Sequence, residues 1–304
     1  ALSDMKSKLT GFGHGADDYI TKPFHPEELV ARINSLLIRT KKVKYLHSLM
    51  GVLGEQFTEK GIEELSRELK IAYEIQMALL PQFGPSIDGI EIGAKLEPAK
   101  FIGGDFYDFF IIDKNKIGIV IGDVSGKGIP AAIFMTMVCS FIHVLVLEEY
   151  PPDEILARLN KLLIADTAMD TFVALTYIIL ESKDQIKMIY ANAGHTEPFI
   201  IDKNKNTQIL PITGGILGLF NEFNFTQQEM SLNSGDTLVL YTDGVTNARN
   251  KDRKMFGINN LLGLIASDTT LPAQELCSIA FETTKQFSED SLKDDMTMVI
   301  LKVL

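Results

Sequence analysis

Residues 116–147 read KIGIVIGDVSGKGIPAAIFMTMVCSFIHVLVL. They begin with an apolar run rich in β-branched residues, which is typical of a buried strand, and a glycine-rich loop follows. The last 19 residues carry no Asp, Glu, Lys or Arg, and Pro130 stands where the first helical residue is expected. This segment is long enough to span a membrane. Because Thr136, Ser140 and His143 interrupt it, we predict a fully buried core helix and no membrane span.

The rest of residues 81–304 alternates short strand-like runs with longer helix-like runs. Strand-like runs occupy residues 90–98, 106–112, 116–124, 172–180, 185–193, 198–203, 237–243 and 296–304. Helix-like runs occupy residues 129–148, 153–167, 258–266 and 272–288. Strands grouped as hairpins, with helices inserted in pairs, predict a layered α+β domain rather than a regular alternation of parallel strands and helices.

The charge of the chain is unevenly distributed. The 304 residues carry a formal net charge of −11, yet residues 1–80 hold 11 basic and 11 acidic side chains. Residues 81–304 therefore hold 29 acidic against 18 basic groups. This balance argues against nucleic-acid binding and indicates either acidic solubility or a demand for cations. Cys139 and Cys277 lie in apolar or helix-like stretches, which favours reduced thiols and a cytoplasmic protein.

Aspartates recur where an apolar strand meets a glycine or a turn. They stand in IGGDFYD, VIGDVSGKG, LYTDGVTNA and KDDMTMVI, and are Asp105, Asp123, Asp243 and Asp294. Carboxylates that converge at strand ends repel one another unless cations neutralise them, and all-oxygen ligation suits Mg²⁺ or Mn²⁺. The sequence lacks the Cys and His spacing of structural zinc sites. Each aspartate alone could be an ordinary turn residue, but four after apolar strands favour a metal site.

Two short segments are similar to known motifs but do not match them. GDVSGKG has three residues between Gly122 and Gly126, and Gly128 follows the lysine, whereas a phosphate-binding P-loop needs four residues and then Ser or Thr. GGDFYD is similar to the GGDEF signature of diguanylate cyclases, but Phe106 replaces the Glu.

Taken in order, IQMALLP, GGDFYD, GDVSGKG, NAGHTEPF, YTDGVTNARN and DDMT resemble the SpoIIE-like branch of the PPM metal-dependent protein serine/threonine phosphatases. The resemblance covers roughly residues 70–304 and implies an α-β-β-α sandwich with two Mn²⁺ or Mg²⁺ ions per site. It implies that Asp105, Asp123 and the carbonyl of Val124 bind the metal pair. By the same resemblance, Asp243 and Asp294 complete the shell of one ion.

Other polar residues in these motifs have less certain roles. Asp295 matches a position that supports the ligands, and Asp108 could support the site or cap a strand. Lys127 could contact the phosphate together with the following helix N-terminus, or it could be a solvated loop lysine. We expect His195 to make a structural hydrogen bond rather than to act in catalysis, and His143 to be a satisfied core histidine.

The expected activity follows from the chemistry of paired cations. Two cations about 3.5–4 Å apart can share one water, lower its pKa and direct it at phosphorus. We therefore expect a phosphoserine/phosphothreonine protein phosphatase, and the resemblance implies an anti-sigma-factor antagonist as substrate. The general acid is unassigned, because Ser125 and Gly126 stand where many relatives carry His. The alternatives are a catalytically silent module of the same fold that binds its partner without turnover, and hydrolysis of a small phosphoester.

The first forty residues resemble the end of a response-regulator receiver domain. Within GADDYITKPFHPEELVARINSLL, Lys22 and Pro23 match the receiver lysine that contacts the phosphoryl group and the proline after it. A complete receiver needs about 120 residues in a doubly wound sheet, so we expect a truncated α/β receiver fragment without its phosphoacceptor. The resemblance implies an upstream histidine kinase that acts through the missing part.

Residues 41–80 are predicted to form a helical linker. Apolar residues at a seven-residue spacing, with two more at the fourth heptad position, indicate a coiled-coil seam: Leu29, Leu36, Val43, Met50 and Phe57, then Leu46 and Leu53. A second helical stretch stops at Pro81 and carries one apolar face: Ile62, Leu65, Leu69, Ala72, Ile75 and Leu79. We predict a homodimer through this linker. The expected domains are residues 1–40, 41–80 and 81–304.

Overall fold

A computed structural model describes residues 59–81, 84–166, 171–220, 223–289 and 292–304. The chain forms two compact units, Ala1–Glu68 and Leu69–Leu304. The predicted receiver fragment and the heptad pattern of residues 29–57 lie outside the described residues.

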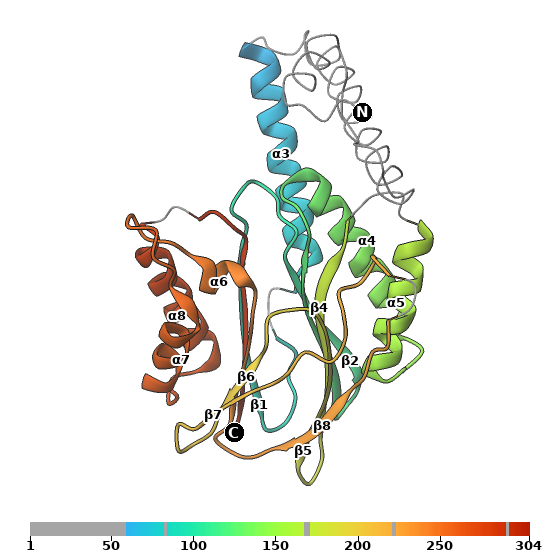
Figure 1. Cartoon of the computed structure of the whole chain (residues 1–304), viewed down its shortest axis with the longest axis vertical. Helices are drawn as coiled ribbons and strands as arrows, with labels where there is room; N and C mark the ends of the chain where they lie inside the picture. Colours follow the sequence, from blue (N-terminus) through green and yellow to red (C-terminus); the bar gives the residue numbers. More distant parts are fainter. Residues whose placement is uncertain (1–58, 82–83, 167–170, 221–222, 290–291) are drawn as a thin grey trace, which may run out of the picture. The chain divides into compact units, whose positions relative to one another are not determined.

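Two five-stranded antiparallel sheets lie face to face (Figure 1). The first sheet has the order β1 (Ile90–Glu97), β10 (Met296–Val303), β9 (Thr237–Tyr241), β6 (Phe199–Ile201), β7 (Thr207–Ile209). The second sheet has the order β2 (Phe106–Asp113), β3 (Lys116–Val124), β4 (Val173–Ser182), β5 (Ile186–Ala193), β8 (Gln228–Leu232).

Helices cover the outer face of each sheet (Figure 1). The helices α4 (Ile129–Val146) and α5 (Pro152–Asp166) pack on the second sheet, and α7 (Gly257–Ser267) and α8 (Ala273–Phe287) pack on the first. A short helix, α6 (Asp243–Asn247), follows β9 directly. The layers are therefore helix, sheet, sheet, helix, and the predicted α-β-β-α sandwich is confirmed.

The alternation of side chains along β3 explains its continuous apolar sequence. Ile119 and Ile121 pack in the cluster between the two sheets, whereas Val120 and Val124 pack in the cluster beneath α4 and α5. A central strand whose two faces are both buried needs apolar residues at every position. Residues 116–124 are therefore a core strand, and the loop after them is held at one fixed edge of the sandwich.

Helix α4 departs from the predicted fully buried helix. By length and composition it could cross a membrane, and it is the one helix in the described part of the chain that could. One face, including Met135, Val138 and Ile142, is buried against the second sheet. Because α4 belongs to an outer layer, Ile133 and Val144 on its other face are 67% and 63% exposed.

Helix α3 (Glu59–Leu79) ends before Pro81, as its sequence predicts. Along the predicted apolar face, Leu65, Ile75 and Leu79 are exposed. Among the side chains of α3 whose burial is described, residues 63–79, the buried polar one is Gln76, which is 5% exposed. An apolar face that remains in contact with solvent is compatible with a linker that pairs with a second copy, and this pairing stays a prediction.

Candidate metal centre

Four strand ends bring the candidate carboxylates to one edge of the sandwich. Asp105 immediately precedes β2 and Asp123 lies near the end of β3, and these strands pair so that Phe106 faces Gly122. From the other sheet, Asp243 opens α6 after β9, and Asp294 lies just before β10. The charges of Asp243 and Asp294 act on Asp123, so carboxylates separated by up to 189 residues in sequence meet at one place.

The surroundings of Asp105 and Asp123, on the second sheet, disfavour the ionised form of both carboxylates. Burial raises the pKa of Asp105 well above its usual value, and the nearby charge of Asp123 adds to this effect. Burial, followed by the charges of Asp243 and Asp294, raises the pKa of Asp123 to about 7, although a side-chain hydrogen bond with Asp105 opposes the shift. Close burial of like charges makes a site that a cation would stabilise.

The position of Asp105 depends on two buried threonines. Thr242 Oγ1 and Thr297 Oγ1 both donate to Asp105 Oδ2, at 2.6 and 2.7 Å. Thr242 Oγ1 in turn accepts a hydrogen bond from the Thr297 backbone amide at 2.9 Å. Thr297 lies in β10 and Thr242 directly follows β9, so the two hydroxyls join Asp105 to the sheet opposite its own.

Asp295 supports the loop that carries Asp105. Its two carboxylate oxygens accept from the backbone amides of Ala99 and Gly104, each at 2.8 Å, and the side chain is buried. A Cβ on Gly103 would lie 2.1 Å from Asp295 Oδ2, so the loop can approach this carboxylate only with glycine there. Asp295 therefore acts on backbone groups behind the acidic edge.

Gln76 fixes the same loop from helix α3. Its side-chain amide donates to the carbonyl of Gly103 at 2.7 Å, and its side-chain oxygen accepts from the Gly103 amide at 3.1 Å. The sequence motif IQMALLP contains Gln76 but does not indicate this contact, because the partner lies 27 residues away. The loop before Asp105 is thus held on both sides.

The turn after Asp123 places a backbone carbonyl near the GGD loop. The Val124 amide donates to the carbonyl of Gly104 at 3.4 Å. A Cβ on Gly104 would lie 2.8 Å from the Val124 oxygen. The Val124 carbonyl, which is the backbone group proposed from sequence, therefore lies beside the residue that precedes Asp105.

Lys127, in the loop between β3 and α4, supplies a compensating charge to the carboxylates of the first sheet. Lys127 Nζ lies 2.7 Å from Asp294 Oδ1 and also donates to the Lys293 carbonyl at 2.6 Å. Burial and the charge of Asp294 raise the pKa of Asp243, whereas the charge of Lys127 lowers it. In this arrangement Lys127 is paired with Asp294 and keeps solvent contact, and its contact with a phosphate stays a prediction.

In the described part of the chain, no three His, Cys, Asp or Glu side chains already form a cluster that could hold one ion. The acidic side chains share one edge and interact electrostatically, but within the described residues they do not form a complete coordination sphere by themselves. Bound ions would therefore also need backbone oxygen, such as that of Val124, or water. The oxygen donors and the raised pKa values fit Mg²⁺ or Mn²⁺.

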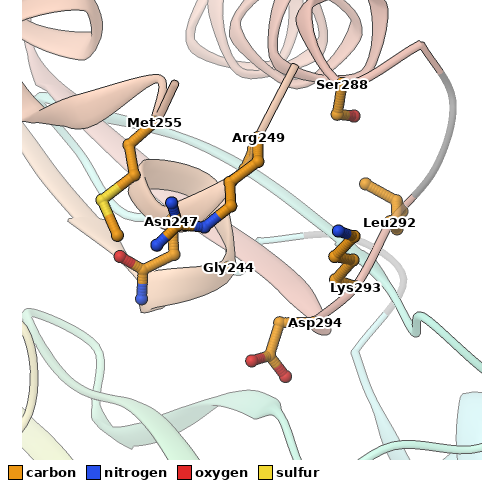
Figure 2. A pocket seen from close by; sticks show the side chains of 9 residues that line it. Gly244, Asn247, Arg249, Met255, Ser288, Leu292, Lys293 and Asp294 are labelled. Atoms are coloured by element: carbon orange, nitrogen blue, oxygen red, sulfur yellow. The ribbon is translucent and has the colours of Figure 1, made fainter. Parts of the chain in front are cut away.

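A cavity of about 220 Å³ adjoins the carboxylates (Figure 2). Asp294 and Gly244 form part of its wall, and Arg249 and Lys293 supply positive charge. Asn247, another lining residue, donates from Nδ2 to Asp243 Oδ2 at 2.9 Å. The cavity therefore lies directly beside the acidic edge, with charged and polar side chains on its wall.

Two histidines lie outside the acidic group. His143 is 57% exposed, so the prediction of a core histidine is wrong; its Nε2 lies 2.6 Å from Asp108 Oδ2. Asp108 therefore connects β2 to α4. Burial raises the pKa of Asp108, although the Phe109 amide and His143 oppose the shift.

Burial lowers the pKa of His195 to about 4, and the His195 backbone amide donates to Asn192 Oδ1. The His195 ring lies with Nδ1 3.2 Å from Thr196 Oγ1, and its structural role stays a prediction.

The sandwich, with carboxylates gathered at one edge, has the fold of the PP2C-type phosphatases. The structure is similar to the SiaA-PP2C domain of Pseudomonas aeruginosa, with a TM-score of 0.72 and 19% identity over 81% of this chain and 99% of that domain. The same fold occurs in the catalytic domain of the serine/threonine phosphatase PstP, solved with two manganese ions, at a TM-score of 0.50 and 11% identity over 71% of this chain and 98% of that one.

Sequence comparison then identifies the family. The model of the Stage II sporulation protein E (SpoIIE) family matches residues 113–304. The chain is 32% identical over 250 residues to phosphoserine phosphatase RsbU of Bacillus subtilis, an alignment that covers 82% of this chain and 74% of RsbU. The chain therefore belongs to the SpoIIE family, and the resemblance derived from its motifs is confirmed.

Two further similarities concern the wider organisation. Protein IcfG of Synechocystis sp. is 28% identical in an alignment of 281 residues that covers 84% of this chain and 44% of IcfG, so this chain spans less than half of that relative. The cell cycle response regulator CtrA of Brucella ovis is 50% identical over 40 residues, 13% of this chain and 17% of CtrA. This match supports the receiver fragment predicted from the sequence.

Proposed function

We propose that the chain is a Mn²⁺- or Mg²⁺-dependent protein phosphatase that hydrolyses phosphoserine or phosphothreonine. The observation that carries the proposal is the meeting of Asp105, Asp123, Asp243 and Asp294 at one edge, where burial and mutual repulsion raise the pKa values of at least three of them. These carboxylates and the Val124 carbonyl would hold two ions. The name of RsbU, a phosphoserine phosphatase, supports the reaction.

The bound cations would supply a water of lowered pKa and neutralise the phosphoryl oxygens. The residues of the chain would place those cations rather than attack the phosphate. Asp105 is kept in position by the hydroxyls of Thr242 and Thr297. Cys139 is unsuited to be a nucleophile, since burial raises the pKa of its thiol to about 12. His195 would be neutral at physiological pH and is buried, which does not favour it as general acid, and the general acid stays unassigned.

The substrate and the regulation belong to the same proposal. We infer that the substrate is a phosphorylated protein, in keeping with the similarity to a phosphoserine phosphatase, and that it is an anti-sigma-factor antagonist in a partner-switching pathway, as the resemblance of the motifs implies. The cavity beside Asp294, with Arg249 and Lys293 on its wall, would receive the chain that flanks the phosphoserine. The phosphatase would act as the output domain of a response regulator, with a histidine kinase upstream and a homodimer formed through the linker.

The proposed reaction predicts a defined pattern of activity. We expect the chain to hydrolyse a phosphoserine peptide and p-nitrophenyl phosphate with Mn²⁺ or Mg²⁺, and to lose turnover in excess chelator. Released phosphate would be measured in each condition, with a phosphotyrosine peptide as a comparison. Turnover that persists in chelator would contradict the metal mechanism. Saturable binding of the phosphopeptide with no phosphate release under any metal condition would instead favour the catalytically silent module.

The threonine contacts predict a second result. Thr297→Val removes one donor to the buried Asp105 carboxylate while keeping the shape of the side chain. We expect Mn²⁺ affinity and kcat each to fall by about 10- to 100-fold, the usual loss when a group that orients a ligand is removed. Thr297→Ser, which restores the hydroxyl, should recover most of both quantities in calorimetry and phosphate-release assays. A Thr297→Val protein with wild-type metal affinity would show that this hydroxyl does not position Asp105.

A further inference from the structure

The backbone around Lys127 is constrained on both sides. Gly126 and Gly128 have φ angles of 101° and 74°, values in the left-handed region that favours glycine. The Ser125 amide donates to the Phe172 carbonyl, and Ser125 Oγ accepts from the Phe172 amide, both at 2.9 Å. Helix α4 begins directly after Gly128. The turn between β3 and α4 thus presents Lys127 in one direction.

The Lys127 ammonium ends in the acidic edge. It lies 2.7 Å from Asp294 Oδ1, and it donates to the Lys293 carbonyl at 2.6 Å. Both side chains of the ion pair keep solvent contact, at 42% exposure for Lys127 and 40% for Asp294. Solvent contact makes such a pair weak enough to open, because exposed ion pairs contribute little free energy. Its two acceptors, Asp294 Oδ1 and the Lys293 carbonyl, lie in the segment just before β10. Together they hold the ammonium in one position.

We propose that Lys127 is an internal counter-ion that competes with the divalent cation for Asp294. The inference rests on the proposed function only in taking Asp294 as a metal ligand. A cation at Asp294 and an ammonium 2.7 Å from the same carboxylate would repel each other, so metal entry requires the ion pair to open. Lys127 thereby stabilises the metal-free acidic edge and raises the metal concentration at which the site fills. The displaced ammonium stays tethered beside the site, where an anionic phosphoryl group is expected.

The test compares two lysines next to the same carboxylate. Lys127→Met removes the ammonium that contacts Asp294, and Lys127→Arg keeps a positive charge. Lys293→Met is the matched control, because its backbone carbonyl contacts Lys127 while its ammonium forms no ion pair within the described residues. Isothermal titration calorimetry with Mn²⁺ and with Mg²⁺ measures Kd, and thermal melts in chelator measure the stability of the metal-free protein.

We expect the Kd for Mn²⁺ to fall by about twofold to fivefold in Lys127→Met, the effect of losing one competing surface ion pair. We expect less than a twofold change in Lys293→Met and a near wild-type Kd in Lys127→Arg. In chelator, the melting temperature of Lys127→Met should be lower than that of the wild type. A purely structural lysine would not strengthen metal binding on removal.

An unchanged or weaker metal affinity in Lys127→Met would overturn the inference, as would an equal gain in Lys293→Met. Phosphate release by the wild type is measured separately. Tighter metal binding in Lys127→Met together with an inactive wild type would overturn the proposed phosphatase activity and leave the counter-ion in place. An active wild type together with unchanged metal affinity in Lys127→Met would overturn the counter-ion alone.

Discussion

Asp243→Asn is expected to lower kcat for a phosphoserine peptide by about 100- to 1,000-fold, because it weakens the hold on a cation that would stabilise the transition state, and losing one such preorganised stabilising group costs about this much. Asparagine keeps the shape of the side chain and can still accept the hydrogen bond that Asn247 Nδ2 donates to Asp243 Oδ2 at 2.9 Å. The substitution therefore removes negative charge from the acidic edge with little change in local contacts. Phosphate release and Mn²⁺ calorimetry on the same preparation would measure both effects.

The control for this substitution is Asp252→Asn, which removes an equal charge from an exposed residue outside the acidic edge. We expect it to retain wild-type kcat and metal affinity. The melting temperature of Asp243→Asn in chelator should equal or exceed that of the wild type, because a buried repulsive charge has gone. Full activity in Asp243→Asn would contradict the assigned ligand set. Inactivity of the wild type as well would favour the silent module of the same fold.

The core of the fold could be predicted from the sequence because buried strands and helices show a recognisable pattern of apolar residues. Strand β3 is apolar throughout since both of its faces are covered. By contrast, β7 (Thr207–Ile209) has three exposed residues, and β8 (Gln228–Leu232) reads QEMSL. These edge strands are held by their pairing with β6 and β5, which local sequence does not encode. The short helix α6 is too brief for a periodic signal.

The candidate site was predictable to the extent that motifs mark strand ends. The four aspartates stand beside glycines or turns, and the order of motifs suggested that they would meet. The contacts that position them were not predictable, because they join residues far apart in sequence. Thr297 reaches Asp105 across 192 residues, and a threonine in a strand is otherwise an ordinary β residue. Likewise, Lys127 could be judged solvated or phosphate-binding from its loop, whereas its actual partner is Asp294.

Metal removal is expected to destabilise the protein, and the size of the effect should depend on pH. At about 100 times Kd, each bound ion stabilises the folded state by about 2.7 kcal/mol. Two ions would thus add about 5 kcal/mol, and a domain of this size gains about 2–4 °C per kcal/mol. We therefore expect Mn²⁺ to raise the melting temperature by roughly 10–20 °C at pH 8 relative to the protein in chelator.

The pH dependence follows from Asp123, whose pKa is raised to about 7 by burial and by the charges of Asp243 and Asp294. In the unfolded chain this carboxyl titrates near its usual pKa of about 3.9. Between about pH 4 and pH 7 the metal-free folded state holds a proton that the unfolded state has lost, so stability falls as pH rises through this window. Asp105, whose pKa is also raised, acts in the same direction.

Cations require the deprotonated carboxylates, so the gain from Mn²⁺ should be small at pH 5 and should grow towards pH 8. Calorimetric melts in chelator and in saturating Mn²⁺ at four pH values would measure both trends. Asp123→Asn should flatten the metal-free profile, because the proton that Asp123 binds in the folded state is no longer exchanged, and it should reduce the Mn²⁺ shift. If the melting temperature in chelator were independent of pH between 5 and 8, the buried carboxylates would not be coupled as the fold places them.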